Sequence, residues 1–111
     1  MMKSYQPSRT IVTFNIVGFQ FWDGADVLAE LKPGTRLTLV PEFDNPHDPN
    51  ALALYYGHTK LGFVPAEHNE LAATMVYYGH SEVFEFVVLQ VAPENSPWNQ
   101  VRVALRVRDN R

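Results

Sequence analysis

The segment that most restricts the fold is residues 44–51, which joins two apolar runs and contains two prolines, two asparagines, two aspartates and a histidine. Pro46 and Pro49 fix their own φ angles and push the residues before them toward extended backbone. Short Asn and Asp side chains hydrogen-bond nearby backbone amides. The segment is therefore predicted to be a rigid, multiply turned connection that holds His47 and Asp48 at the rim of a sheet, where binding groups are often placed.

Alternating and β-branched residues predict a chain made mainly of strands. Strands are expected at residues 10–17, 36–40, 51–56, 60–64, 83–91 and 101–108. The best helix candidate is residues 65–78, where Leu71, Met75 and Tyr78 share one apolar face. A second, short helix is expected at residues 23–31, with Val27, Leu28 and Leu31 on one face. This pattern predicts a mainly β fold with one or two short helices, a closed or partly open small β-barrel of about six strands, OB-like or SH3-like.

The length of 111 residues suits one domain. Residues 1–9 are expected to be a loose lead and residues 10–111 the barrel domain. No apolar run approaches the roughly 20 residues of a membrane helix, and the N-terminus lacks the apolar core of a signal peptide, so a cytoplasmic location is expected. The chain has no cysteine, which excludes disulfides and thiolate metal sites.

The net charge of −3 argues against binding of a polyanion over a broad surface, because proteins that do so are normally basic. The positive charge is also uneven. Four arginines lie in the last ten residues: Arg102, Arg106, Arg108 and Arg111. They are expected to be a solvated strand face, and only proximity to an aromatic surface would make them phosphate contacts.

Catalysis is not expected. No serine or cysteine stands in a recognisable nucleophile setting, and neighbours such as His47 and Asp48 on a rigid turn usually point apart. The other histidines, His58, His68 and His80, lack the i, i+4 spacing of a helical metal pair. The chain is therefore predicted to be no enzyme and to need no cofactor. The remaining alternative is a hydrolase or metal-dependent enzyme, with zinc held by the four histidines and nearby carboxylates.

Three aromatic residues crowd the segment from Phe19 to Trp22. In an extended chain, side chains alternate between the two faces, so at least one ring must face solvent, a ligand or a partner. Phe19 and Phe21 would share one face and Gln20 and Trp22 the other, which makes Trp22 the more exposed candidate. The alternative is that these rings fill the interior of the barrel.

His47 and Asp48 each have two interpretations. The Asp48 carboxylate could accept a hydrogen bond from the backbone N–H of Asn50 and only stiffen the turn, or it could contact a ligand. The His47 ring could be exposed without a role, or it could stack on a base. Turn statistics alone favour the stiffening role of Asp48.

Four motifs follow one another along the chain: Ile-Val-Gly-Phe-Gln-Phe-Trp-Asp-Gly at 16–24, Leu-Thr-Leu-Val-Pro-Glu at 37–42, the turn at 44–51, and Leu-Gly-Phe-Val-Pro at 61–65. In this order they resemble the HIRAN domain family over most of residues 10–91. The resemblance implies an OB-like β-barrel that recognises DNA, found fused to helicases of the Swi/Snf type and also as a standalone bacterial protein, the form that this chain resembles.

The resemblance also implies site residues. In the fork-remodelling member of the family, the domain captures the 3′ end of single-stranded DNA. Aromatic side chains stack there on the terminal bases, and an aspartate accepts a hydrogen bond from the 3′-hydroxyl. Carried over by motif, Phe21, Trp22 and His47 would form an aromatic shelf. Asp48 would accept the hydrogen bond from the hydroxyl.

Three positions depart from that member. Gln20 stands where it has an arginine, His47 where it has a tyrosine, and Ala66 or a neighbour where it has a lysine. Each missing cation would forfeit about 1 to 3 kcal/mol of charge-assisted hydrogen bonding. Weak binding of a DNA end is therefore expected unless Lys60 or the terminal arginines compensate.

Two functions follow. The first is a non-enzymatic module that binds single-stranded DNA ends in DNA repair or replication-fork processing, beside a helicase or nuclease partner. The second is a protein-interaction module that presents the aromatic shelf to a partner or to its own copy. Phosphate-dependent binding falls with added salt, whereas an aromatic protein contact barely changes, so a salt series distinguishes them.

Overall fold

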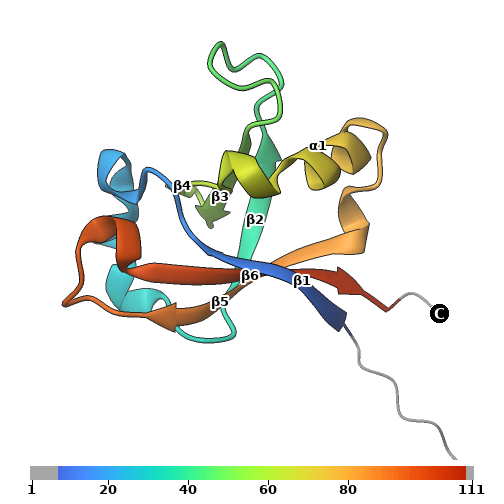
Figure 1. Ribbon diagram of the computed structural model, residues 1–111. Coiled ribbons are helices and arrows are strands. Elements are labelled where there is room, and N and C mark those ends of the chain that lie inside the picture. Colours follow the sequence, from blue (N-terminus) through green and yellow to red (C-terminus); the bar gives the residue numbers. More distant parts are fainter. Residues whose placement is uncertain (1–7, 110–111) are drawn as a thin grey trace, which may run out of the picture.

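The computed structural model describes residues 8–109 and shows one six-stranded sheet in the order β1-β6-β5-β2-β3-β4. The strands are β1 (Ser8–Asn15), β2 (Arg36–Pro41), β3 (Leu52–Tyr56), β4 (Thr59–Phe63), β5 (Phe84–Val91) and β6 (Val101–Arg108) (Figure 1). All neighbouring strands are antiparallel. The predicted strand segments are thus confirmed, with ends that differ by at most two residues. β1 already contains residues 8 and 9, which were expected in the lead; residues 1–7 lie outside the described part.

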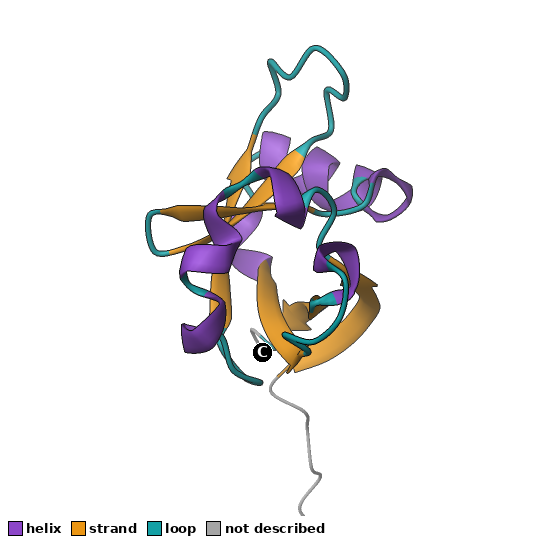
Figure 2. Cartoon of the chain, turned by 90° about the vertical axis from the view of Figure 1, so that its left-hand side faces the viewer, coloured by secondary structure: helices purple, strands orange, loops and turns teal. Residues whose placement is uncertain are grey.

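The two edges of the sheet come together without closing into a continuous ladder. Just after β1, Val17 exchanges two backbone hydrogen bonds of 2.9 Å with Phe63 at the end of β4. Figure 2 shows how strongly the sheet bends to allow this. The fold class is therefore confirmed as mainly β, in the partly open form of a small barrel.

Gly62 makes this junction possible. Its φ of +147° is unusual for an L-residue, and a Cβ atom at this position would lie 2.4 Å from the carbonyl oxygen of Val17. Only glycine lets the two backbones approach so closely. The Leu-Gly-Phe-Val motif thus marks the point where the chain crosses the edge of the sheet.

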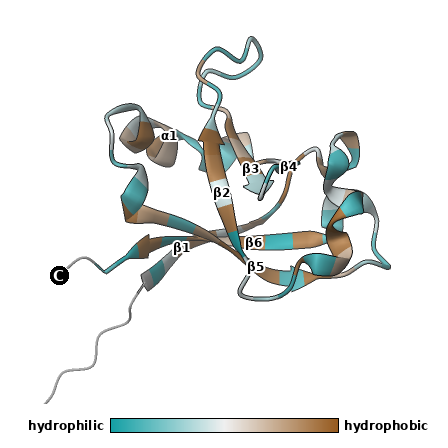
Figure 3. Ribbon diagram, turned by 180° about the vertical axis from the view of Figure 1, so that it is seen from behind, coloured by the Kyte–Doolittle hydropathy of each residue, from teal (hydrophilic) through white to brown (hydrophobic). Residues whose placement is uncertain are grey.

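The core lies between the two halves of the bent sheet. Its largest fully buried side chains include Ile16, Leu52, Leu54, Leu61 and Phe86. Apolar residues are concentrated on the strands, whereas the loop after β2 is mostly hydrophilic (Figure 3). None of the helices in residues 8–109 is long and apolar enough to span a membrane.

The main helix is shorter than predicted and buries a different face. The segment begins as a 3-10 turn, η4 (Ala66–His68), and only α1 (Glu70–Tyr77) is α-helical. The small side chains of Ala72 and Ala73 are buried, whereas Leu71 is 62% exposed and Tyr78 is also exposed. The prediction that Leu71 and Tyr78 share the apolar face was wrong because two alanines let the helix lie close against the core.

The predicted helix at residues 23–31 forms two 3-10 turns instead, η2 (Asp23–Asp26) and η3 (Leu28–Glu30). Its expected apolar face is nevertheless confirmed, since Leu31 is buried and Val27 and Leu28 pack against the core. The remaining 3-10 turns are η1 (Phe19–Phe21), η5 (Ser81–Val83) and η6 (Pro97–Asn99).

Candidate functional site

The loop after β2, residues 42–51, is held by its own side chains. The Asn45 Oδ1 atom accepts hydrogen bonds from the backbone N–H groups of His47, at 2.8 Å, and Asp48, at 3.2 Å. At the base of the loop, the N–H of Glu42 donates to the carbonyl of Ala51 at 2.9 Å. These bonds, together with two prolines, confirm the rigid, multiply turned connection that the sequence predicts.

The Asp48 carboxylate fixes the loop at both of its oxygens. Oδ1 accepts the N–H of Asn50 at 2.9 Å, which confirms the turn-stiffening interpretation. Oδ2 accepts a hydrogen bond from the Asn69 side chain, also at 2.9 Å, and Asn69 is only 2% exposed. A carboxylate offers about four acceptor positions, so these two bonds orient Asp48 and leave acceptor capacity.

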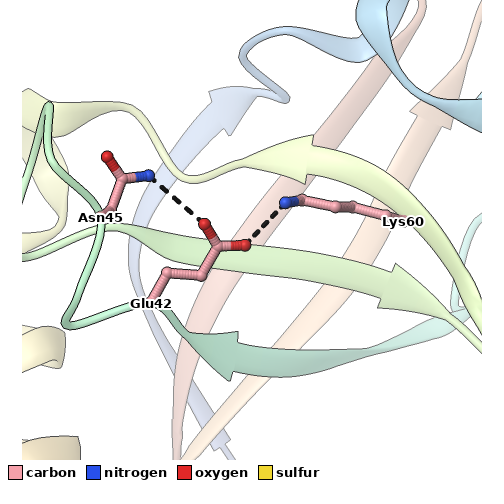
Figure 4. Close-up of polar contacts among 3 residues, drawn as sticks. All are labelled: Glu42, Asn45 and Lys60. Carbon is pink, nitrogen blue, oxygen red and sulfur yellow. Dashed lines mark hydrogen bonds and ion pairs between the residues drawn. The ribbon is translucent and has the colours of Figure 1, made fainter.

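Lys60 holds the base of the loop against two rings. Its Nζ lies 2.6 Å from Glu42 Oε2, and Glu42 Oε1 accepts a hydrogen bond from the Asn45 side chain (Figure 4). The same Nζ lies 3.8 Å from the centroid of the Trp22 ring and 4.6 Å from that of Phe63. The charge of Lys60 is therefore already paired, and a phosphate would have to compete with Glu42 for it.

Two of the three rings of the Phe-Gln-Phe-Trp segment, Phe21 and Trp22, lie at the surface, but not as predicted. Phe21 is 76% exposed and Trp22 41%, so the prediction that Trp22 is the more exposed ring was wrong. The reason is that η1 is a 3-10 turn, in which side chains are spaced by about a third of a turn and do not alternate. Phe19 is accordingly buried, and Trp22 is partly covered by an edge-on contact with Phe63.

Two adjacent depressions contain four of the predicted site residues. The loop pocket, of about 270 Å³, lies between the loop and β4, and His47, Asp48, Phe63 and Ala66 are among its lining residues. The ring groove, of about 530 Å³, is lined in part by Gln20, Phe21, Glu67, His68, Trp98 and Arg102. Val17 lines both depressions, so they meet at the junction between β1 and β4.

The predicted residues thus fall into two groups around that junction. His47 and Asp48 face the loop pocket, whereas Gln20 and Phe21 face the ring groove. Trp22 and Lys60 line neither depression and contact Phe63, which forms a wall of the loop pocket.

Sequence reasoning missed several lining residues. Trp98 lies on η6 and its ring is exposed. A tryptophan in a loop of Pro, Ser and Asn residues was a usable signal in the sequence. Phe63 and Val17 gave no such signal, because their role depends on a contact between segments far apart in the chain.

Of the clustered arginines within residues 8–109, only Arg102 lines the ring groove. It donates a hydrogen bond to the Thr13 hydroxyl at 2.7 Å. Arg108 instead lies 3.7 Å from the buried Glu85, which also pairs with Arg36 at 3.5 Å. Arg111 lies outside the described residues. The groove therefore combines one arginine with the acidic Glu67, which gives it little net charge.

The histidines are dispersed over the surface. His47 and His68 line different depressions, and His58 lies in the turn between β3 and β4. Within residues 8–109 there is no group of three His, Cys, Asp or Glu side chains that could hold a metal ion.

Comparison with known proteins places this geometry in a family. The sequence model of the HIRAN domain matches residues 11–108. A protein from Lactobacillus plantarum, solved by a structural genomics consortium, has a similar fold, with a TM-score of 0.71, 23% identity and coverage of 92% of this chain and 97% of that one. The HIRAN domain of human HLTF is similar with a TM-score of 0.59, 15% identity and coverage of 93% and 82%. No curated protein sequence matches. Because the family model spans nearly the whole chain, the chain belongs to the HIRAN domain family.

Proposed function

We propose that this chain binds single-stranded DNA and prefers a 3′ end that carries a free hydroxyl. Membership of a family of DNA-binding modules supports nucleic-acid binding in general. The observation that carries the finer proposal is the adjacency of the two depressions. An exposed ring, Phe21, lies in one and an oriented carboxylate, Asp48, in the other, with Val17 between them.

The sizes of the two depressions suggest how a strand would lie. The loop pocket is slightly smaller than a typical ligand pocket and suits a single terminal sugar or base. The larger ring groove has Phe21 and Trp98 to stack on the preceding bases. Each stacked base contributes about 1 to 3 kcal/mol, and stacking tolerates any sequence.

Asp48 is the group that would distinguish the chemical end of the strand. A carboxylate accepts a hydrogen bond from a 3′-hydroxyl but repels a 3′-phosphate. Its orientation is already set by Asn50 and Asn69, so it need not be ordered when DNA binds. The shelf residue His47, beside it, would stack on the last base.

Because this chain lacks two of the cationic side chains of the DNA-end-binding member, we expect it to bind DNA weakly and over a small surface. Gln20, which lines the ring groove, stands where the DNA-end-binding member has an arginine. Ala66, which lines the loop pocket, stands at or next to the position where that member has a lysine. Arg102 lines the groove in which a strand would lie, and Lys60 would be available only if it left Glu42. Such a domain would act in DNA repair or replication-fork processing beside a helicase or nuclease that supplies further affinity.

The test is a fluorescence titration with short oligonucleotides that end in a 3′-hydroxyl or a 3′-phosphate, read through Trp22 and Trp98. The hydroxyl form should bind more tightly, and Asp48→Asn should remove the difference. This variant removes the charge, and its amide can still accept from Asn50 and donate to Asn69 once the Asn69 amide turns over.

Asp44→Asn is the matched control, because Asp44 is an exposed carboxylate in the same loop that accepts no hydrogen bond from any residue in 8–109. It should leave the preference for the hydroxyl intact. Equal binding of the two oligonucleotides by the unaltered protein would refute the role of Asp48. Failure of every oligonucleotide to bind would refute the DNA proposal itself.

A second candidate function is a protein-interaction module that uses the same groove. The observation that favours it is the low charge of the site, where Lys60 is paired with Glu42 and Arg102 shares the ring groove with Glu67. Exposed rings such as Phe21 and Trp98 are typical of protein interfaces.

A further inference from the structure

A second aromatic cluster lies on α1 and the loop after β2. The rings of Phe43 and Tyr77 meet edge to face at 5.2 Å between centroids, and Tyr77 meets Tyr78 in the same way at 5.1 Å. Tyr77 and Tyr78 are 65% and 71% exposed. In Figure 1 the loop rises beside α1. The contact between Phe43 and Tyr77 joins this loop to the helix. Three rings are thus held together at the surface, with Tyr77 roughly perpendicular to each of the other two.

These rings border a pocket of about 330 Å³. The tyrosine pocket, as we name it, is lined by Phe43, Pro49, Asn50, Ala73, Thr74, Tyr77 and Tyr78. None of these residues lines the loop pocket or the ring groove. Its volume lies at the lower end of the range for ligand pockets, which suits one long side chain.

The loop and the helix that line the tyrosine pocket each carry an acidic residue beside it in the sequence. Asp44 follows Phe43 directly, and Glu70 precedes Thr74 and Tyr77 by four and seven residues, which places it on the same face of the helix. The sequence has no lysine or arginine between Arg36 and Lys60, or between Lys60 and Arg102. The loop and α1 therefore contribute acidic groups and aromatic faces, and no Lys or Arg of their own.

Aromatic ring faces attract cations, and nearby carboxylates strengthen that attraction. A nucleic acid could stack on the same rings, but its phosphates would be repelled by Asp44 and Glu70. We propose that the tyrosine pocket binds an arginine side chain from a basic segment of a partner protein. The planar guanidinium stacks on a tyrosine face and can also pair with a carboxylate.

The test is a titration of the full chain with a fluorescein-labelled peptide of alternating glycine and arginine, followed by fluorescence anisotropy. We expect saturable binding, and no binding of a peptide in which glutamate replaces arginine. Tyr77→Ala should weaken binding about two- to fivefold, since one ring face at an exposed site is lost while the net charge is unchanged. Glu70→Gln should weaken it as well.

Two matched controls separate the pocket from general attraction to a negative protein. Leu71→Ala removes an exposed apolar side chain of the same helix outside the pocket and should have no effect. Glu94→Gln removes an exposed charge in the loop before η6, far along the chain from the pocket, and should also have no effect. Circular dichroism would verify that each variant is folded.

Three results would overturn this inference. One is the absence of binding by the arginine peptide, and another is equal weakening by Glu94→Gln and Glu70→Gln. The third is a dimer, seen by sedimentation velocity, that Tyr77→Ala dissociates, because a second copy would then occupy the pocket. Oligonucleotide binding should not change in Tyr77→Ala, so this inference and the DNA proposal fail or succeed separately.

Discussion

Asn69 is the residue that ties the loop after β2 to the start of α1. Its buried side chain donates to Asp48 Oδ2, and a hydrogen bond to a charged group contributes about 1.5 to 3 kcal/mol. Asn69→Ala should therefore lower the free energy of unfolding by about that amount, measured by urea denaturation. Asn95→Ala, which removes an exposed amide with one bond of 3.3 Å, should change it by less than about 0.5 kcal/mol.

The Asn69→Ala variant also tests how the orientation of Asp48 affects oligonucleotide binding. Asp48 keeps its bond to Asn50 but loses the bond that orients its second oxygen. We expect Asn69→Ala to reduce the preference for a 3′-hydroxyl. An unchanged stability would show that the bond between Asn69 and Asp48 contributes little to the loop.

At the scale of elements, we expect the stability of the fold to be sensitive to substitution at the junction between β1 and β4. Gly62→Ala would place a methyl group 2.4 Å from the Val17 carbonyl oxygen, and the φ of +147° is strained for alanine. We expect a loss of about 3 kcal/mol or more of unfolding free energy, since the two backbone bonds between Val17 and Phe63 must shift. Thermal and urea unfolding would measure it.

Gly34→Ala is the matched control for this prediction. Gly34 also has a positive φ, of +95°, but a Cβ atom there would have open space around it. Only the backbone penalty of about 1 to 2 kcal/mol is then expected. If both variants lost equal stability, close approach of the chains at Gly62 would not be the cause.

At the scale of the whole molecule, charge sets how binding depends on salt. One arginine lines the ring groove, and Lys60 adds a second cation only if it leaves Glu42. For single strands, the logarithm of affinity falls by about 0.7 per phosphate contact per decade of salt. Oligonucleotide binding should therefore show a slope of about −0.7 to −1.4, measured by titration across a salt series.

The same series separates the two candidate functions. Phe21→Ala should weaken binding without changing the slope, because it removes stacking and no charge. A slope of about −3 or steeper would contradict a local contact and would require a broad cationic surface. A partner protein bound through the rings alone should show almost no dependence on salt.

The sequence by itself determined the strands, the rigid loop and the family. Period-two alternation is a local property, and so is the turn chemistry of Asn45 and Asp48, which the structure reproduces. The motif order was enough to place the chain among HIRAN domains, which the family model confirms. The position of His47 and Asp48 on a rigid loop could therefore be predicted from the sequence.

The tertiary structure alone decided which faces are covered. The period of α1 allowed more than one apolar face, and packing chose Ala72 and Ala73 over Leu71 because small side chains let the helix approach the core. The local turn at Phe19–Phe21 likewise reversed the expected exposure of Phe21 and Trp22. Burial of this kind depends on contacts between distant segments, as does the meeting of Val17 with Phe63, and no local pattern specifies such contacts.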